Sequence, residues 1–258
     1  MLLGILLGIV CCFVKKEFVE KCVLGFDKAI GHLLKLLIYL IPIFLVGFMM
    51  KLIHEKTLES IIKDYAVVFA VIACAQFSYI ALLYFMAGRF QFKECISSMK
   101  NMLPAAIAGF GSMSSAAAMP LTILGVEKNS KQTAFSQLVV PATVNVHLIG
   151  DCFAIPIFAF AVMKTFGMPT PFFGEFVLFA MYFVLAKFSV AAVPGGGIIV
   201  MLPLLESHFG FQAEMASLIT ALYILFDPVI TCANVCGNGG FAQMLSKFKP
   251  MLDKKVSN

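Results

Sequence analysis

Long apolar runs recur along the whole chain, and they restrict its fold more than any other feature. About 20 consecutive apolar residues cross a bilayer as a helix. Hydrophobic residues make up 61% of the chain and charged residues 13%, against about 45–50% and about 25% in soluble domains. This composition excludes a soluble globular protein, a disordered chain and, despite a net charge of +5, a nucleic-acid binder. We expect an all-α polytopic membrane protein. The apolar runs cover residues 2–14, 33–50, 65–88, 102–126, 134–163, 172–205 and 211–245.

Several of the later runs are interrupted by glycine, proline and polar residues. The run 172–205 is too long for one span and too short for two, and the run 211–245 contains Asp227-Pro228. Irregular backbone at membrane depth is tolerated only where it is buried in protein or lines a cavity. Paired broken segments in two halves of a chain point to a transporter binding site. We therefore predict re-entrant helical hairpins at 102–126 and 172–205, and broken transmembrane helices at 134–163 and 211–245.

These elements suggest a division of the chain into two parts. Residues 65–258, beginning with a helix over 65–88, are expected to form a transport domain that contains an inverted repeat. Residues 1–64 are expected to be remnant scaffold helices. The run 2–14 is short for a complete span and has neither a basic lead-in nor a clear cleavage site. It is most simply a truncated helix, so that the chain would start in the middle of a larger architecture.

The distribution of basic residues predicts an orientation. If both hairpins enter and leave on one side, 13 Lys and Arg residues lie on one side of the membrane and 4 on the other. The positive-inside rule then places the C-terminus in the cytoplasm, with the first hairpin opening inward and the second outward. We expect a multi-pass integral protein of an inner or plasma membrane.

Four motifs carry a family resemblance. Residues 114–122 resemble the serine-rich first hairpin of the dicarboxylate/amino acid:cation symporter family, which includes the glutamate transporters. Residues 193–197 resemble the tip of that family's second hairpin, residues 227–238 its last helix, and residues 141–151 its unwound seventh helix. Their order and spacing also match, over nearly all of residues 15–249.

The resemblance implies an architecture and a set of partners. It implies a transport domain that moves against a trimeric scaffold by an elevator mechanism, and a divergent chain that lacks the family's first three helices and part of the fourth. The partners would be a small-molecule substrate, the lipid bilayer and, at full length, two further copies in a homotrimer. Neither nucleic acid, a cofactor nor a metal is expected.

Asp227 is the first candidate substrate-binding residue, because an ionised group deep in an apolar run is costly unless compensated. The resemblance implies that it is the counter-ion of a substrate ammonium. The alternative is a helix-breaking Asp-Pro pair satisfied by local backbone groups. Thr231 and Asn234 share a helical face with it, and the resemblance implies that both bind substrate, with Asn234 taking the main carboxylate.

The hairpin tips supply the other candidate substrate-binding residues. Ser114 and Ser115, with neighbouring backbone N–H groups at a half-helix N-terminus, would complete a carboxylate cradle. The alternative for these serines is small-residue helix packing. Val193 and Gly195 are the candidates from the tip of the second hairpin.

Two positions depart from the acidic-amino-acid carriers of the family. Ile230 stands where those carriers place an arginine that holds the second carboxylate, and Met113 stands where another arginine can substitute. The single arginine of the chain, Arg89, lies in a loop. A neutral amino acid is therefore a better expectation than glutamate or aspartate, and a cationic one is an alternative.

The sodium-binding positions of the family also differ. Asn238 stands where the last helix usually carries a sodium-coordinating aspartate. Aligned without gaps from Pro141, the sodium-binding carboxylate of the seventh helix is replaced by Ile149; a two-residue gap instead aligns Asn145 and puts His147 there. In either register the aspartate is absent, so we expect coupling to H+ rather than Na+.

Lys187 and His147 suggest how such coupling could work. Lys187 is expected near mid-bilayer, where its ammonium could act as a tethered cation in place of sodium, paired with Asp151. The alternatives are snorkelling or a purely structural ion pair. His147, with a reference pKa of about 6.5, is a candidate proton carrier, and the alternative is a hydrogen-bonded core histidine. The candidate ion-coupling residues are His147, Asp151, Lys187 and Asn238.

Together these features predict a symporter, a secondary active transporter of a small amino acid or carboxylate. One alternative is a truncated, non-transporting remnant, or a subunit that needs an N-terminal partner. A second is an intramembrane enzyme that uses Cys232 or Ser115 with His147 and Asp151 in a nucleophilic arrangement. The two-hairpin pattern would then go unexplained, so we predict that the chain is not an enzyme.

Overall fold

The computed structural model describes residues 57–256 continuously, together with scattered positions between 21 and 54. The chain divides into two compact units, Met1–Leu58 and Glu59–Asn258. Most of the expected scaffold remnant, including the run 2–14, lies outside the described residues. Between 57 and 256 every regular element is a helix, as expected for an all-α protein. The helices are α3 (Thr57–Ala87), α4 (Phe92–Ser112), α5 (Ser115–Ser130), α6 (Thr133–Thr143), α7 (Ile149–Thr165), α8 (Phe173–Lys187), α9 (Gly196–Phe209) and α10 (Ala213–Val256).

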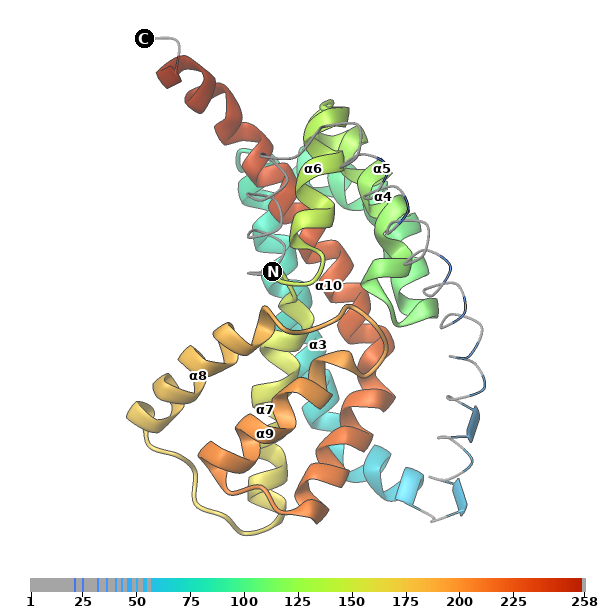
Figure 1. Cartoon of the computed structure of the whole chain (residues 1–258), viewed down its shortest axis with the longest axis vertical. Helices are drawn as coiled ribbons and strands as arrows, with labels where there is room; N and C mark the ends of the chain where they lie inside the picture. The colour runs from blue at the N-terminus through green and yellow to red at the C-terminus, as the bar shows by residue number, and fades with distance from the viewer. Residues whose placement is uncertain are drawn as a thin grey trace. The chain divides into compact units, whose positions relative to one another are not determined.

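The first helical hairpin consists of α4 and α5, joined by Met113 and Ser114 (Figure 1). Met113 has a φ of +49°, in the left-handed region, so it ends α4 and reverses the chain. Asn129 of α5 bonds back to α4, to the Asn101 side chain at 2.8 Å and to the Ser98 carbonyl at 3.1 Å. These contacts make the two helices antiparallel neighbours.

The second helical hairpin consists of α8 and α9, joined by residues 188–195. Its two arms are held together by aromatic packing, with the rings of Phe179 and Phe209 centred 4.6 Å apart. Both hairpins therefore form in the two regions where the interrupted apolar runs predicted them. Their re-entrant course through a bilayer and the inverted repeat stay predictions.

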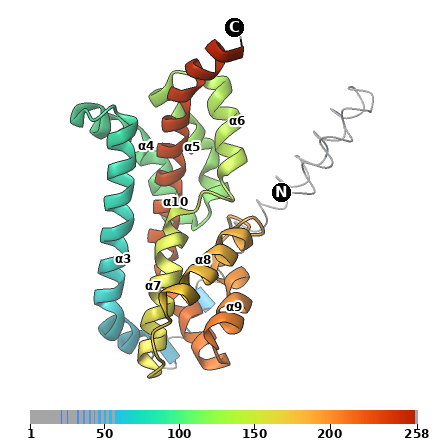
Figure 2. The same cartoon turned by 90° about the vertical axis from the view of Figure 1, so that its left-hand side faces the viewer.

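Helix α10 is the central element of this unit (Figures 1 and 2). The first hairpin lies beside its C-terminal half, and the second lies beside its N-terminal half. Lys247 near the end of α10 donates to the Ala87 carbonyl at the end of α3. At the opposite end, the Tyr65 hydroxyl lies 2.7 Å from Thr165 Oγ1 and joins the start of α3 to the end of α7. The tips of both hairpins lie toward the middle of α10, so the two hairpins open at opposite ends of the unit (Figures 1 and 2).

The segment expected to contain one broken helix, 134–163, is divided by a break. Helix α6 ends at Thr143 and α7 begins at Ile149, leaving residues 144–148 without regular helical structure. The other expected break, within 211–245, is not present, because α10 is one continuous helix.

Packing explains why α10 continues through its glycines. A glycine inside a helix costs about 1 kcal/mol relative to alanine, but here it allows neighbouring helices to approach. A Cβ at Gly237 would meet the Ile149 side chain at 2.8 Å, and one at Gly240 would meet Leu83 at 3.0 Å. The run of glycines that suggested a break therefore marks close contacts with α7 and α3.

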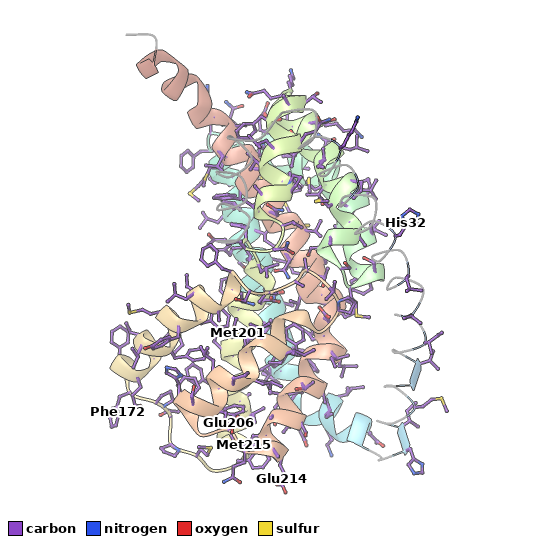
Figure 3. All side chains as sticks on the ribbon, in the orientation of Figure 1. His32, Phe172, Met201, Glu206, Glu214 and Met215 are labelled. Carbon is purple, nitrogen blue, oxygen red and sulfur yellow. The ribbon has the colours of Figure 1, made fainter. Side chains whose placement is uncertain are left out.

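The outer surface of this unit is apolar along several helices. Val67 of α3 is 73% exposed and Phe173 of α8 is 82% exposed. Two described helical stretches, Ile61–Ala87 and Ala213–Lys247, are long and apolar enough to cross a membrane. Figure 3 shows the acidic residues Glu206 and Glu214 at the end of the unit opposite the C-terminal part of α10.

Candidate functional site

The tips of the two hairpins meet beside the middle of α10. The Ser114 hydroxyl donates to the Ala192 carbonyl at 2.8 Å, which joins one tip to the other. The Gly195 N–H donates to Asp227 Oδ2 at 2.9 Å, which joins the second tip to α10. Gly195 has a φ of +69°, where glycine is favoured because it has no Cβ. Asp227 is thereby enclosed, with 3% of its surface exposed.

The Asp227 carboxylate has donors on both oxygens. Besides the Gly195 contact, Oδ1 accepts a hydrogen bond from Thr231 Oγ1 at 2.9 Å, one turn further along α10. Each carboxylate oxygen can accept more than one hydrogen bond. The carboxylate therefore retains acceptor capacity for a further donor such as an ammonium. Val193, in the same tip as Gly195, is half-buried.

The start of α5 is a second polar feature at the tips. Ser114 is its N-cap, and its hydroxyl accepts from the Ala117 N–H at 3.2 Å. The Ala116 N–H points to the Ala192 carbonyl at 3.4 Å. Ser115 is buried, and its hydroxyl makes no hydrogen bond within the described part of the chain. This helix N-terminus, with its positive dipole end, is suited to an anionic group.

A buried ion pair lies next to this region. Lys187 Nζ lies 2.7 Å from Asp151 Oδ2, and the two residues are 3% and 1% exposed. Asp151 is in the first turn of α7 and Lys187 in the last turn of α8, so each charge also lies at the helix end that favours it. The contact agrees with the pairing considered from the sequence, whereas a role in ion coupling stays a prediction.

Asp151 is also bonded to α10. Its Oδ1 accepts from the Tyr223 hydroxyl at 2.7 Å and lies 3.5 Å from Asn234 Nδ2. Gly197 at the start of α9 leaves space for this arrangement, because a Cβ there would meet Asp151 Oδ2 at 2.6 Å. One carboxylate thus connects α7, α8 and α10.

Asn234 connects the ion pair to the start of α7. Its Oδ1 accepts from the Gly150 N–H at 2.7 Å, and the Gly150 carbonyl accepts from Gln76 Nε2 of α3 at 2.9 Å. A Cβ on Gly150 would collide with the Ile230 carbonyl. The Asn234 side chain therefore satisfies the Gly150 N–H, one of the donors that the start of α7 leaves free.

Asn238 and His147 lie further toward the C-terminal half of α10. Asn238 Oδ1 accepts from Thr143 Oγ1 at 2.6 Å, and its Nδ2 lies 3.4 Å from the Val140 carbonyl. His147 stacks on Phe241 with ring centres 4.4 Å apart, and its buried Nδ1 has no hydrogen-bond partner. No described hydrogen bond joins His147 to the Asp151 network.

Four residues of this region were not among the sequence-based candidates. Gln76 and Tyr223 are polar groups inside apolar helices, which is a signal available from sequence, but nothing local indicates their partners. Thr143 and Asn145 flank the break, and the Asn145 side chain accepts from the Ala192 N–H at 2.9 Å. The break is thus joined to the second hairpin tip.

The profile of the sodium:dicarboxylate symporter family matches residues 1–248. The chain belongs to this family. It is 27% identical over 173 residues to human excitatory amino acid transporter 2, covering 66% of this chain and 29% of that protein. It is 28% identical over 141 residues to the excitatory amino acid transporter of Onchocerca volvulus, covering 54% of this chain and 28% of that protein.

A bacterial relative carries a different name. The proton/glutamate-aspartate symporter of Escherichia coli K12 is 26% identical over 149 residues, covering 58% of this chain and 34% of that protein. The matched stretch of this chain thus spans about a third of the length of these relatives. The family and these relatives are integral membrane transporters, which excludes the enzyme alternative.

Proposed function

We propose that this family member binds a small neutral amino acid between its hairpin tips and carries it across the membrane in symport with protons. The observation that carries the proposal is the convergence of both tips on Asp227, through the Gly195 contact and the contact between Ser114 and Ala192. A buried carboxylate next to a helix N-terminus offers one acceptor for an ammonium and one set of donors for a carboxylate. An α-amino acid has both groups.

The substrate would lie with its ammonium on Asp227 and its carboxylate toward the start of α5. Thr231 already donates to Asp227 and would orient that carboxylate. Ser115, whose hydroxyl is uncommitted within the described residues, would donate to the substrate carboxylate. Asn234 would also donate to the substrate carboxylate through its Nδ2, which now lies 3.5 Å from Asp151 Oδ1.

The charges of the site favour a neutral side chain on the substrate. The site carries a net negative charge when Asp227, Asp151 and Lys187 are all ionised. A second carboxylate on the substrate would therefore be repelled. Ile230 and Met113 are buried apolar residues. Arg89 lies in the turn between α3 and α4, where no contact links it to Asp227. The matched relatives are named for glutamate and aspartate, and this chain lacks an arginine at its site.

Proton coupling is supported by the groups around Asp151. The Lys187 ammonium neutralises Asp151 at 2.7 Å and would substitute for a bound sodium ion. His147, with an unpartnered Nδ1, would take up the transported proton. Asn238 has no charge and is committed to Thr143, so it would stabilise the helix break rather than bind sodium.

The resemblance to the family supports a proposal for the larger assembly. The proposed mechanism is an elevator-like movement of the transport domain, residues 65–258, against a scaffold, in a homotrimer with a cytoplasmic C-terminus. The alternative of a non-transporting remnant, or of a subunit requiring an N-terminal partner, would share the binding site but lack uptake.

Uptake into proteoliposomes tests the proposal, with a panel of labelled neutral, acidic and cationic amino acids and with sodium and pH gradients varied independently. We expect uptake of a neutral amino acid driven by an inward proton gradient without sodium. Asp227→Asn should abolish it, whereas Glu214→Gln, at the exposed start of α10, should not. Sodium-dependent uptake that ignores pH would contradict the coupling, and preferred uptake of glutamate would contradict the substrate. Amino-acid binding without uptake would favour the remnant.

A further inference from the structure

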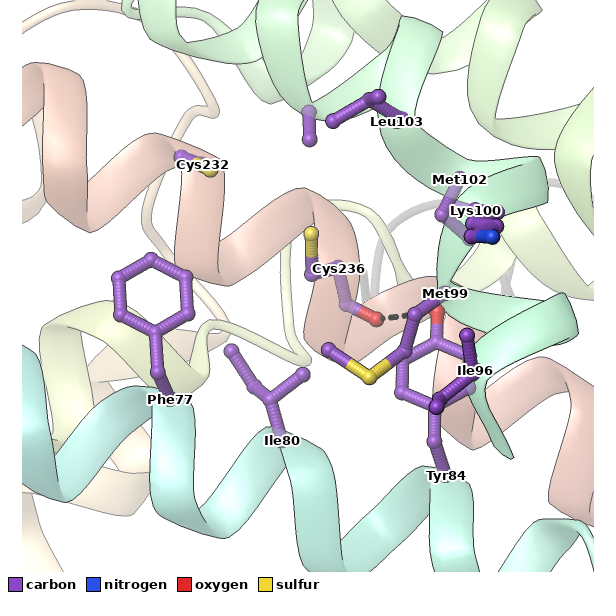
Figure 4. Close-up of a pocket in the computed structure, with 11 residues that line it drawn as sticks. Phe77, Ile80, Tyr84, Ile96, Met99, Lys100, Met102, Leu103, Cys232 and Cys236 are labelled. Atoms are coloured by element: carbon purple, nitrogen blue, oxygen red, sulfur yellow. Dashed lines mark hydrogen bonds between the residues drawn. The ribbon is translucent and has the colours of Figure 1, made fainter. Parts of the chain in front are cut away.

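A cavity of about 420 Å³ lies between α3, α4 and α10, away from the hairpin tips (Figure 4). This volume is within the range of about 300–1,000 Å³ typical of small-molecule sites. Phe77, Ile80 and Tyr84 form the α3 side, and Cys232 and Cys236 form the α10 side. Helix α4 supplies the rest of the lining.

The interior of this cavity is mainly apolar, apart from the thiols of Cys232 and Cys236. The Tyr84 hydroxyl, its main polar atom, donates to the Cys236 carbonyl at 2.9 Å, as the dashed line in Figure 4 shows. An apolar cavity without hydrogen-bond partners does not hold ordered water. A ligand that fills it gains free energy chiefly by burying apolar surface.

The α4 side of the cavity continues onto an exposed apolar surface. Met99 and Leu103 line the cavity and are 37% and 56% exposed. Ile107, one turn beyond Leu103, is 64% exposed. An exposed apolar surface of a membrane protein is suited to contact with hydrocarbon, from which a lipid could enter the cavity directly.

One charge accompanies this apolar lining. Lys100 is the charged residue among those that line the cavity, it is exposed, and it forms no ion pair with any residue between 57 and 247. Lys100 lies between two residues of α4 that bond to other helices. Ser98 accepts from Gln243 of α10, and Asn101 donates to Asn129 near the end of α5, at the open end of the first hairpin. A lysine near a membrane surface extends its ammonium toward the headgroups and attracts anionic ones.

We propose that this cavity is a binding site for an anionic phospholipid, with one acyl chain between α3, α4 and α10 and the phosphate on Lys100. Charge complementarity selects the anionic headgroup, and the apolar lining selects the chain. The site is separate from Asp227 and does not depend on the transported substrate. An acyl chain there would contact α3 and α10 together and strengthen a boundary that is otherwise joined by the hydrogen bonds of Tyr84 and Lys247.

Native mass spectrometry of the purified chain tests the headgroup. The protein is released from micelles that contain equal amounts of phosphatidylglycerol and phosphatidylcholine with the same acyl chains. We expect one phosphatidylglycerol to be retained in preference to phosphatidylcholine. Lys100→Gln should weaken its retention about fivefold, the effect of losing one basic side chain near the surface. Lys128→Gln removes an exposed charge from α5 outside the cavity and should leave retention unchanged.

Variants that fill the cavity test the acyl chain. Ala106→Leu adds bulk to the lining and should abolish preferential retention, whereas Ile107→Phe adds bulk on the exposed face and should not. Cys232→Leu provides a second filling variant from α10 if Ala106→Leu fails to give monodisperse protein. Equal retention of the two lipids, equal effects of Lys100→Gln and Lys128→Gln, or full retention after filling would each overturn the proposal.

Discussion

Replacing Lys187 by methionine should destabilise the protein strongly. The change removes one partner of a buried ion pair whose members are 3% and 1% exposed and whose charged atoms lie 2.7 Å apart. Removing one partner of such a pair costs about 3–5 kcal/mol because the other charge stays buried and uncompensated. Tyr223 and Asn234 also donate toward Asp151, which places the expected loss nearer the lower limit. At about 2–4 °C per kcal/mol, a loss of about 3 kcal/mol should lower the melting temperature by about 6–12 °C.

The chain contains no tryptophan, so the assay is best made with a fluorescent-protein fusion. Heated detergent samples are separated by size-exclusion chromatography, and the temperature at which half of the monodisperse peak is lost is recorded. Lys164→Met is the matched control, because Lys164 lies in the last turn of α7 and is exposed. It should change the midpoint by less than about 2 °C, since surface substitutions are usually within about 0.5 kcal/mol.

A double variant distinguishes the contribution of the ion pair from that of the packing of its two side chains. Lys187→Met combined with Asp151→Asn leaves two neutral side chains, and the introduced amide oxygen can still accept from Tyr223. We expect most of the lost stability to return, because buried ion pairs are often replaceable by neutral groups of similar size. The reasoning is wrong if Lys187→Met and Lys164→Met have the same melting temperature, or if the double variant has a melting temperature no higher than that of Lys187→Met.

Two further substitutions have definite expectations. Tyr223→Phe deletes a hydrogen bond to the charged Asp151 and should cost about 1.5–3 kcal/mol, whereas Tyr182→Phe, at an exposed position of α8, should be silent in the same melting assay. Gly150→Ala places a methyl group against the backbone of α10 and should cost about 1–3 kcal/mol by overpacking, while Gly174→Ala has open space around it. Equal melting temperatures within either pair would show that the contact contributes nothing.

Local sequence signals predicted the hairpins because turns and apolar runs are properties of short segments. The first tip contains Ser114, a residue type favoured at helix N-caps, and the second tip contains Gly195, a residue type that readily adopts a positive φ. The break between α6 and α7 likewise falls where the polar residues of 141–151 interrupt an apolar run. Each of these features can be seen in about ten consecutive residues.

Features that depend on distant neighbours were harder to predict. The glycines in the middle of α10 look the same in the sequence whether a helix breaks there or another helix packs closely. Only the contacts with Ile149 and Leu83 distinguish these outcomes. The long-range bonds of Gln76 and Tyr223 belong to the same class. The Lys187–Asp151 contact could be considered from sequence because two opposite charges in an apolar environment have few other partners.

The Lys187–Asp151 pair also fixes one point of the second hairpin to α7. Helix α8 is anchored at its last turn, so it cannot swing away from α7 without separating two charges in a medium of low polarity. Beyond that anchor, the tip is held by hydrogen bonds from Gly195 to Asp227 and between Ala192 and neighbouring elements. A displacement that uncovers Asp227 would therefore begin in residues 188–195, because α9 packs against α7, α8 and α10 through buried side chains such as Met201 and Leu205.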